Sequence, residues 1–139
     1  MSKAFTLLEL VVVILIVGVL ATLGFTQYGR MTERARGAEA KQILGDMRKL
    51  ATAYWLANGQ MTGISDRDLN IGTSMDQIPS ACASTHYFSY SWSICASATV
   101  CLTATRCTTG GKVPQGPSAL TLMLTSNQQT GVATWSGDY

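Results

Sequence analysis

The sequence of 139 residues is long enough for one compact domain, and its formal net charge of +2, with only 13% charged residues, is too weak to indicate a nucleic-acid partner. It contains a single histidine and no phosphate-binding glycine pattern, so no arrangement of residues typical of catalysis is present. Composition therefore argues against an enzyme and a nucleic-acid-binding protein, and it indicates neither cofactor nor metal.

The N-terminal stretch is a continuous apolar run. Between Lys3 and Arg30 the only acidic or basic side chain is Glu9. The 21 residues from 5 to 25 would form a helix of about 31 Å, which matches a bilayer core of roughly 30 Å. The run is longer than the apolar core of a secretory signal and no small-x-small cleavage pattern closes it. It predicts one transmembrane helix.

Glu9 is the unusual residue of this helix. A carboxylate at the centre of a membrane helix costs about 2.5–3.5 kcal/mol on insertion scales, and less near the helix end. No cation lies within the same apolar segment. A partner for Glu9 is therefore expected from Lys3, from a neighbouring chain, or from a newly made N-terminus.

These residues carry a resemblance to a known family. The N-terminal segment resembles the leader and first helix of the type IV pilin superfamily, with the sequence Lys3-Ala4-Phe5-Thr6-Leu7-Leu8-Glu9 followed by apolar residues 10–21. The resemblance depends on the basic leader, on the phenylalanine, and on the glutamate, which is the fifth residue counted from that phenylalanine. That superfamily includes pilus subunits, pseudopilins of type II secretion and competence pilins. Ala4 stands where the family usually has glycine, and the proline that many major pilins carry near Thr26 is absent.

The resemblance implies a processing and assembly route. Prepilin peptidase would cut between Ala4 and Phe5 on the cytoplasmic side and methylate the new amine of Phe5. Glu9 would then pair with the N-terminal amine of a neighbouring subunit in a helical homo-oligomeric filament. An assembly ATPase and an inner-membrane platform would drive assembly, which would move the subunit from the inner membrane to a cell-surface pilus or a periplasmic filament.

After Arg30 the helix is expected to continue as an amphipathic stem and to end at Asn58-Gly59, where glycine provides a C-terminal cap. Its apolar positions recur mostly at spacings of three and four: Met31, Ala35, Ala38, Leu44, Met47, Leu50, Ala51, Tyr54 and Trp55. Residues 58–85 lack sustained periodicity and are expected to form a connecting loop, in which Asp66 and Asp68 belong to a polar turn.

From His86 the pattern changes to strands. Phe88, Tyr90 and Trp92 alternate with serines. Further alternation at 100–105 and at 120–124, and a short run from Val132 to Trp135, predict more strands, with a turn region from Gly110-Gly111 to Pro117. The expected fold is α+β: a leader (1–4), a transmembrane and filament-core helix (5–29), an amphipathic half (30–57), the loop (58–85) and an antiparallel sheet of three or four strands (86–139), as in pilins.

The chain has four cysteines: Cys82, Cys95, Cys101 and Cys107. An even number in an exported head predicts two structural disulfides. No C-x-x-C pair supports a metal or redox site. Three connectivities are possible, and spacing favours Cys95 with Cys101 across a hairpin, which leaves Cys82 for Cys107.

The function expected is that of a structural pilus subunit. The alternatives within the superfamily are a type II secretion pseudopilin and a minor or competence pilin. An alternative from another functional class is a single-pass membrane-anchored binding domain, which would contain the same apolar helix.

Overall fold

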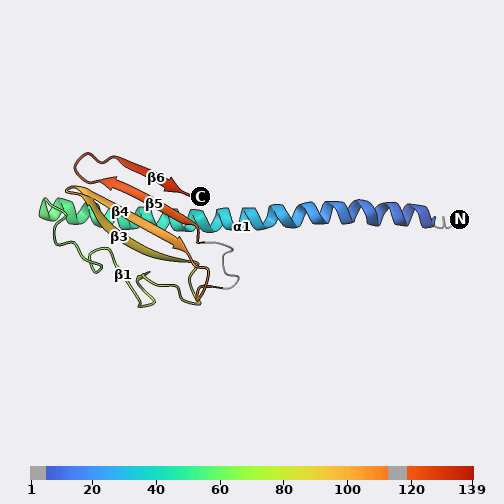
Figure 1. Cartoon of the computed structure of the whole chain (residues 1–139), viewed down its shortest axis with the longest axis horizontal. Helices are drawn as coiled ribbons and strands as arrows, with labels where there is room; N and C mark the ends of the chain where they lie inside the picture. The colour runs from blue at the N-terminus through green and yellow to red at the C-terminus, as the bar shows by residue number, and fades with distance from the viewer. Residues whose placement is uncertain (1–5, 113–118) are drawn as a thin grey trace. The chain divides into compact units, whose positions relative to one another are not determined.

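The computed structural model describes residues 6–112 and 119–139 of the chain. Its elements are α1 (Leu7–Asn58), β1 (Ile71–Gly72), β2 (Ile78–Pro79), β3 (Phe88–Ala96), β4 (Thr99–Arg106), β5 (Thr121–Asn127) and β6 (Ala133–Gly137) (Figure 1). The predicted α+β fold, a long N-terminal helix with a C-terminal antiparallel sheet, is confirmed, and the sheet has four strands. By compactness the chain divides into two units, one ending at Ala35 and the other running from Arg36 to Tyr139.

The first unit contains the apolar part of α1, whose side chains are exposed on every face. Leu7 is 82% exposed, Leu15 63% and Phe25 79%. By length and composition α1 is the one helix in the described part of the chain that can cross a membrane, and none of its most apolar stretch is buried. A helix that is apolar all round needs lipid or other protein to cover it.

In the second unit, α1 packs one narrow face into the core that it shares with the sheet. The buried positions follow one another at alternating spacings of three and four: Gly37, Ala40, Leu44, Met47 and Ala51. The helix ends where expected, at Asn58, because Gly59 adopts a left-handed φ of 70° and its amide donates to the carbonyl of Trp55 at 2.7 Å.

The apolar face predicted for this half is correct only in part. Leu44, Met47 and Ala51 are buried, whereas several other predicted members are exposed: Met31, Ala35, Ala38 and Leu50. Gly37 is buried although it has no side chain and therefore contributes no hydrophobic signal to the sequence.

The four strands form a meander in the order β3-β4-β5-β6, each antiparallel to the next. Alternate residues of β4 face the core, as predicted, and two of them pair with buried residues of β5: Leu102 with Leu124 and Ala104 with Leu122. The last strand starts at Ala133, one residue later than expected, and Val132 is 60% exposed. The predicted turn up to Pro117 lies partly outside the described residues.

The segment between the helix and β3 contributes to the core, although the sequence indicated only a connection. Its apolar side chains are buried in the same cluster as those of α1 and the sheet: Met61, Ile64, Leu69 and Ile71. β1 and β2 pair in parallel, with Ile71 opposite Ile78. The carboxylate of Asp66 accepts a hydrogen bond of 2.6 Å from the indole of Trp92 on β3. The segment is thereby fixed to the sheet.

Candidate functional site

Glu9 lies in the first turn of α1 and is bonded to Thr6. The backbone amide and the hydroxyl of Thr6 both donate to Oε2 of Glu9, at 2.9 and 2.8 Å. In return the amide of Glu9 donates to Oγ1 of Thr6 at 3.3 Å. This reciprocal arrangement is a capping box, in which two helix-terminal amides that have no partner inside the helix are satisfied by side chains.

The capping box gives Glu9 a first partner within its own chain, which was not among the three sources expected from the sequence. The signal was present, because a threonine followed three residues later by a glutamate, at the start of an apolar run, is a helix-start motif. The carboxylate is also well placed for the positive end of the helix dipole. The bonds described for Glu9 use Oε2, and a carboxylate has capacity for more donors on its second oxygen.

The other residues predicted for this site cannot be compared with the structure. Ala4 and Phe5, where cleavage and methylation are expected, lie outside the described residues, as does Lys3. The chain brings Glu9 within one helical turn of Thr6, the residue that directly follows Phe5 in the sequence.

The cysteines lie in the second unit and form two disulfides. Cys82 is joined to Cys107 and Cys95 to Cys101, which is the connectivity that spacing favoured. The first bridge links the segment before β3 to the end of β4, across 25 positions of sequence, with Cα atoms 5.8 Å apart. The second closes the β3–β4 hairpin at an irregular position in the strand pairing, between Ile94 and Ala96.

Three cationic groups surround the half-buried ring of Tyr87. Arg36 of α1 lies 4.4 Å from the ring centroid, Lys112 lies 4.8 Å away and Arg106 of β4 lies 5.2 Å away. Arg106 is buried, and its guanidinium donates to the backbone carbonyls of Tyr87 and Cys107. These contacts place the cations in structural cation–π interactions that join the helix, β4 and the segment after it.

The two aspartates of the predicted polar turn, Asp66 and Asp68, form hydrogen bonds within the fold. Within residues 6–112 and 119–139 there is no group of three or more His, Cys, Asp or Glu side chains that could hold a metal ion. Asp68 accepts hydrogen bonds from the hydroxyl and amide of Ser65, which hold the pKa of its carboxyl below the ordinary value. With Asp66 bonded to Trp92, both aspartates of the predicted polar turn act as hydrogen-bond acceptors within the fold.

Comparisons with known proteins point to one superfamily. Residues 1–25 match the family described as the prokaryotic N-terminal methylation motif. A fimbrial protein of Neisseria meningitidis serogroup B is 34% identical over 76 residues, which cover 55% of this chain and 44% of that protein. A type IV major pilin protein PilE1 of Neisseria gonorrhoeae is 38% identical over 60 residues, covering 43% and 36% of the two chains. Part of the chain is therefore similar to type IV pilins and fimbrial proteins.

The similarity covers only part of this chain and of its relatives. The chain spans less than half the length of the curated relatives it matches. No solved structure matches it. The motif match includes Thr6 and Glu9, so the capping box lies within the segment that matches the N-terminal methylation motif. The relatives are named as a fimbrial protein and a type IV major pilin protein.

Proposed function

We propose that this chain is a structural subunit of a type IV pilus-like filament. The observation that carries the proposal is the N-terminal methylation motif at residues 1–25, whose part from Leu7 onward lies on a helix with apolar side chains exposed on all faces. The relatives named as fimbrial proteins and type IV major pilins favour a pilus over a type II secretion pseudopilus or a minor or competence pilin. The filament would be a helical homo-oligomer.

The proposed route begins in the inner membrane. Prepilin peptidase removes residues 1–4 by cutting between Ala4 and Phe5, and the amine of Phe5 is then methylated. Methylation leaves that amine basic, so it keeps its positive charge. The new terminus lies next to Thr6, and Glu9 becomes the fifth residue of the mature chain. Processing thus creates a cation beside an apolar helix that has none of its own between residues 5 and 29.

Assembly replaces lipid around the apolar helix with the helices of other subunits. In the membrane the capping box satisfies part of the hydrogen-bonding capacity of Glu9, but Thr6 is neutral and leaves the negative charge uncompensated. In the filament the methylated amine of a neighbouring subunit supplies the opposite charge, which is favourable in a medium of low dielectric. An assembly ATPase and an inner-membrane platform would extract the subunits, and the filament would emerge at the cell surface.

The charge and the cap are separable by substitution. Glu9→Gln keeps a side chain that is suitable for a capping box and removes only the charge. We expect normal membrane insertion, cleavage and helix content for this variant, together with a large loss of filaments in the sheared extracellular fraction. Thr6→Ala is the matched control, because it removes the hydroxyl of the cap and retains the charge. Its filament yield is expected to stay near that of the unaltered chain.

The experiment expresses the full chain with a pilus assembly system and examines the sheared fraction by electron microscopy and intact mass. The expected mass begins at Phe5 and includes one methyl group and two disulfides. Filaments of normal yield from Glu9→Gln would contradict the charge pair. An uncleaved chain that stays in the membrane and forms no filaments would contradict the proposed function and favour a single-pass anchored binding domain.

A further inference from the structure

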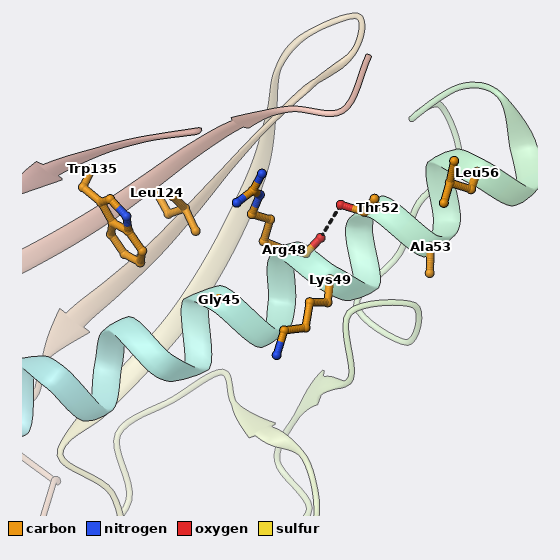
Figure 2. A pocket seen from close by; sticks show the side chains of 8 residues that line it. All are labelled: Gly45, Arg48, Lys49, Thr52, Ala53, Leu56, Leu124 and Trp135. Carbon is orange, nitrogen blue, oxygen red and sulfur yellow. Dashed lines mark hydrogen bonds between the residues drawn. The ribbon is translucent and has the colours of Figure 1, made fainter. Parts of the chain in front are cut away.

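The second unit has an open groove between α1 and the outer strand β6. Figure 2 shows its lining, in which Trp135 and Leu124 of the sheet stand over Gly45 of the helix, and Leu56 extends it. The groove has a volume of about 530 Å³. Trp135 pairs with the buried Leu124 and so faces the helix side of the sheet, yet it is 47% exposed. Leu56 is 79% exposed.

Gly45 leaves open space on the helix side of the groove. A Cβ built at this position meets nothing within 4 Å. Polar contacts keep β5 and β6 in place beside it. Arg48 donates to Oγ of Ser126 at 3.0 Å and to the carbonyl of Gly131 at 2.8 Å. Thr52 donates to Gln128 at 2.7 Å. The groove is therefore part of the folded second unit.

Elsewhere on the second unit an apolar side chain projects from a hydrogen-bonded turn. Met75, between β1 and β2, is 94% exposed. The turn around it is closed by reciprocal contacts of Ser74 and Gln77, and the amide of Ile78 donates to the carbonyl of Asn70 at 2.8 Å. Single exposed apolar residues are common. A fully exposed methionine at the tip of an ordered turn is suited to insertion into a partner, because its side chain adapts to irregular space.

We propose that the groove beside Trp135 receives the Met75 turn of a second copy of this chain, an inference that rests on the proposed filament function. Charge supports the pairing. Asp76 directly follows Met75, and Lys49 lines the groove. Lys49 pairs with Asp46 at 2.7 Å, but both side chains are exposed, at 80% and 51%, and such a surface pair is easily exchanged. Met75 would enter the apolar part of the groove while Asp76 meets Lys49.

The arrangement of the two surfaces supports a contact that propagates. Figure 1 draws β1 and β6 on opposite sides of α1, and the residues that line the groove do not include the Met75 turn of the same chain. A contact between two different surfaces of identical subunits is heterologous, and a heterologous contact whose rotation does not close generates an open helical filament. The groove and the turn thus supply a head contact in addition to the packing of apolar helices.

The test places a photo-crosslinking amino acid at position 75 of the full chain and irradiates assembled filaments. We expect a crosslinked dimer whose joined peptide, identified by mass spectrometry, contains Trp135 or Leu56. The matched control places the same amino acid at Ile94, a partly exposed apolar residue of β3 that is 46% exposed. Filaments whose position-75 crosslinks are absent or map elsewhere would overturn the inference and leave the filament function intact. Absence of filaments from the unaltered chain would overturn both.

Two further variants address the groove and the charge. Gly45→Leu is expected to fill the groove from the helix side, because a Cβ at this position meets nothing within 4 Å. The second unit is expected to fold while the position-75 crosslink is lost. Asp76→Lys is expected to reduce crosslinking, and addition of Lys49→Asp to restore it. Circular dichroism and the intact disulfides report folding in each case. Unchanged crosslinking in Gly45→Leu filaments, or no recovery in the charge exchange, would contradict the inference.

Discussion

Gly37 of α1 lies directly beneath the ring of Tyr139. A Cβ at Gly37 would overlap Cδ1 and Cγ of that ring, so the close approach depends on the missing side chain. The ring of Tyr139 also packs edge to face against Phe88 of β3, with centroids 5.7 Å apart. One glycine on the helix therefore allows an aromatic side chain at the end of the described chain to fill the space between helix and sheet.

Gly37→Ala should destabilise the second unit. Overpacking at Tyr139 is expected to cost about 1–3 kcal/mol, against a gain of up to about 1 kcal/mol from the better helix propensity of alanine. Gly45→Ala is the control, because it brings the same gain in propensity and its Cβ meets nothing within 4 Å. Thermal unfolding of the full chain in detergent should give a lower Tm for the first variant and an equal or higher Tm for the second.

A double-mutant cycle decides whether the Tyr139 contact is the cause. In a Tyr139→Ala background the cost of Gly37→Ala should largely disappear, since the overlapping ring is gone. If Gly37→Ala were equally destabilising in both backgrounds, the explanation would be wrong.

The helix face illustrates what the sequence could and could not predict. Leu44 and Met47 follow a hydrophobic period and were assigned correctly. Gly37 carries no such signal, because its burial depends on Tyr139, about 100 positions away in the sequence. The core positions Met61 and Leu69 were likewise missed, since they are held by tertiary contacts and follow neither the helical nor the strand period. The local hydrophobic pattern predicted the helix and strands, whereas contacts between residues distant in sequence determined which side chains are buried.

The two disulfides should differ in their effect on stability. In the chain-entropy model, closing a loop with a separation of 25 residues, as Cys82–Cys107 does, stabilises by about 3.5 kcal/mol. The separation of 6 residues for Cys95–Cys101 gives about 2 kcal/mol. We therefore expect a larger loss of unfolding free energy for Cys82→Ser/Cys107→Ser than for Cys95→Ser/Cys101→Ser, measured by denaturant titration. A reversed order would contradict this explanation.

The sequence predicts part of the candidate site, as it predicts part of the helix face. Glu9 is identified from sequence because it is the one charge in an apolar run. Its bond to Thr6 follows a local motif that was available and was not used. In contrast, the groove beside Trp135 depends on the strand order, the pairing of Trp135 with Leu124 and the glycine opposite them. No local pattern contains these three facts together.

Loss of the capping box should have a local effect. Thr6→Ala removes the side-chain cap, which typically costs about 1 kcal/mol of helix stability. We expect increased amide hydrogen exchange confined to the first turns of α1 in detergent micelles, with no change in the exchange of β4. The control Thr26→Ala lies on the same helix, where the hydroxyl donates to the carbonyl of Leu23 and caps nothing. Equal exchange in both variants would exclude a capping role for Thr6.

Tyr90 should make the second unit sensitive to alkaline pH. Its ring is buried in the core, and this burial, with a smaller contribution from the negative charge of Glu39, raises the pKa of the phenol above the ordinary value. In the unfolded chain a tyrosine ionises near pH 10. Above that pH the unfolded state loses the proton while the folded state retains it, so the unfolded state binds fewer protons and stability falls as pH rises.

The measurement compares unfolding free energies of the full chain at neutral pH and at increasing pH above about 10, where the unfolded phenol ionises. Tyr90→Phe retains the ring and removes the titrating group, so its stability should decline less over that range. Glu39→Gln should give an intermediate result, because it removes the smaller of the two causes and leaves burial unchanged. Parallel declines for Tyr90→Phe and the unaltered chain would show that another group controls the alkaline transition.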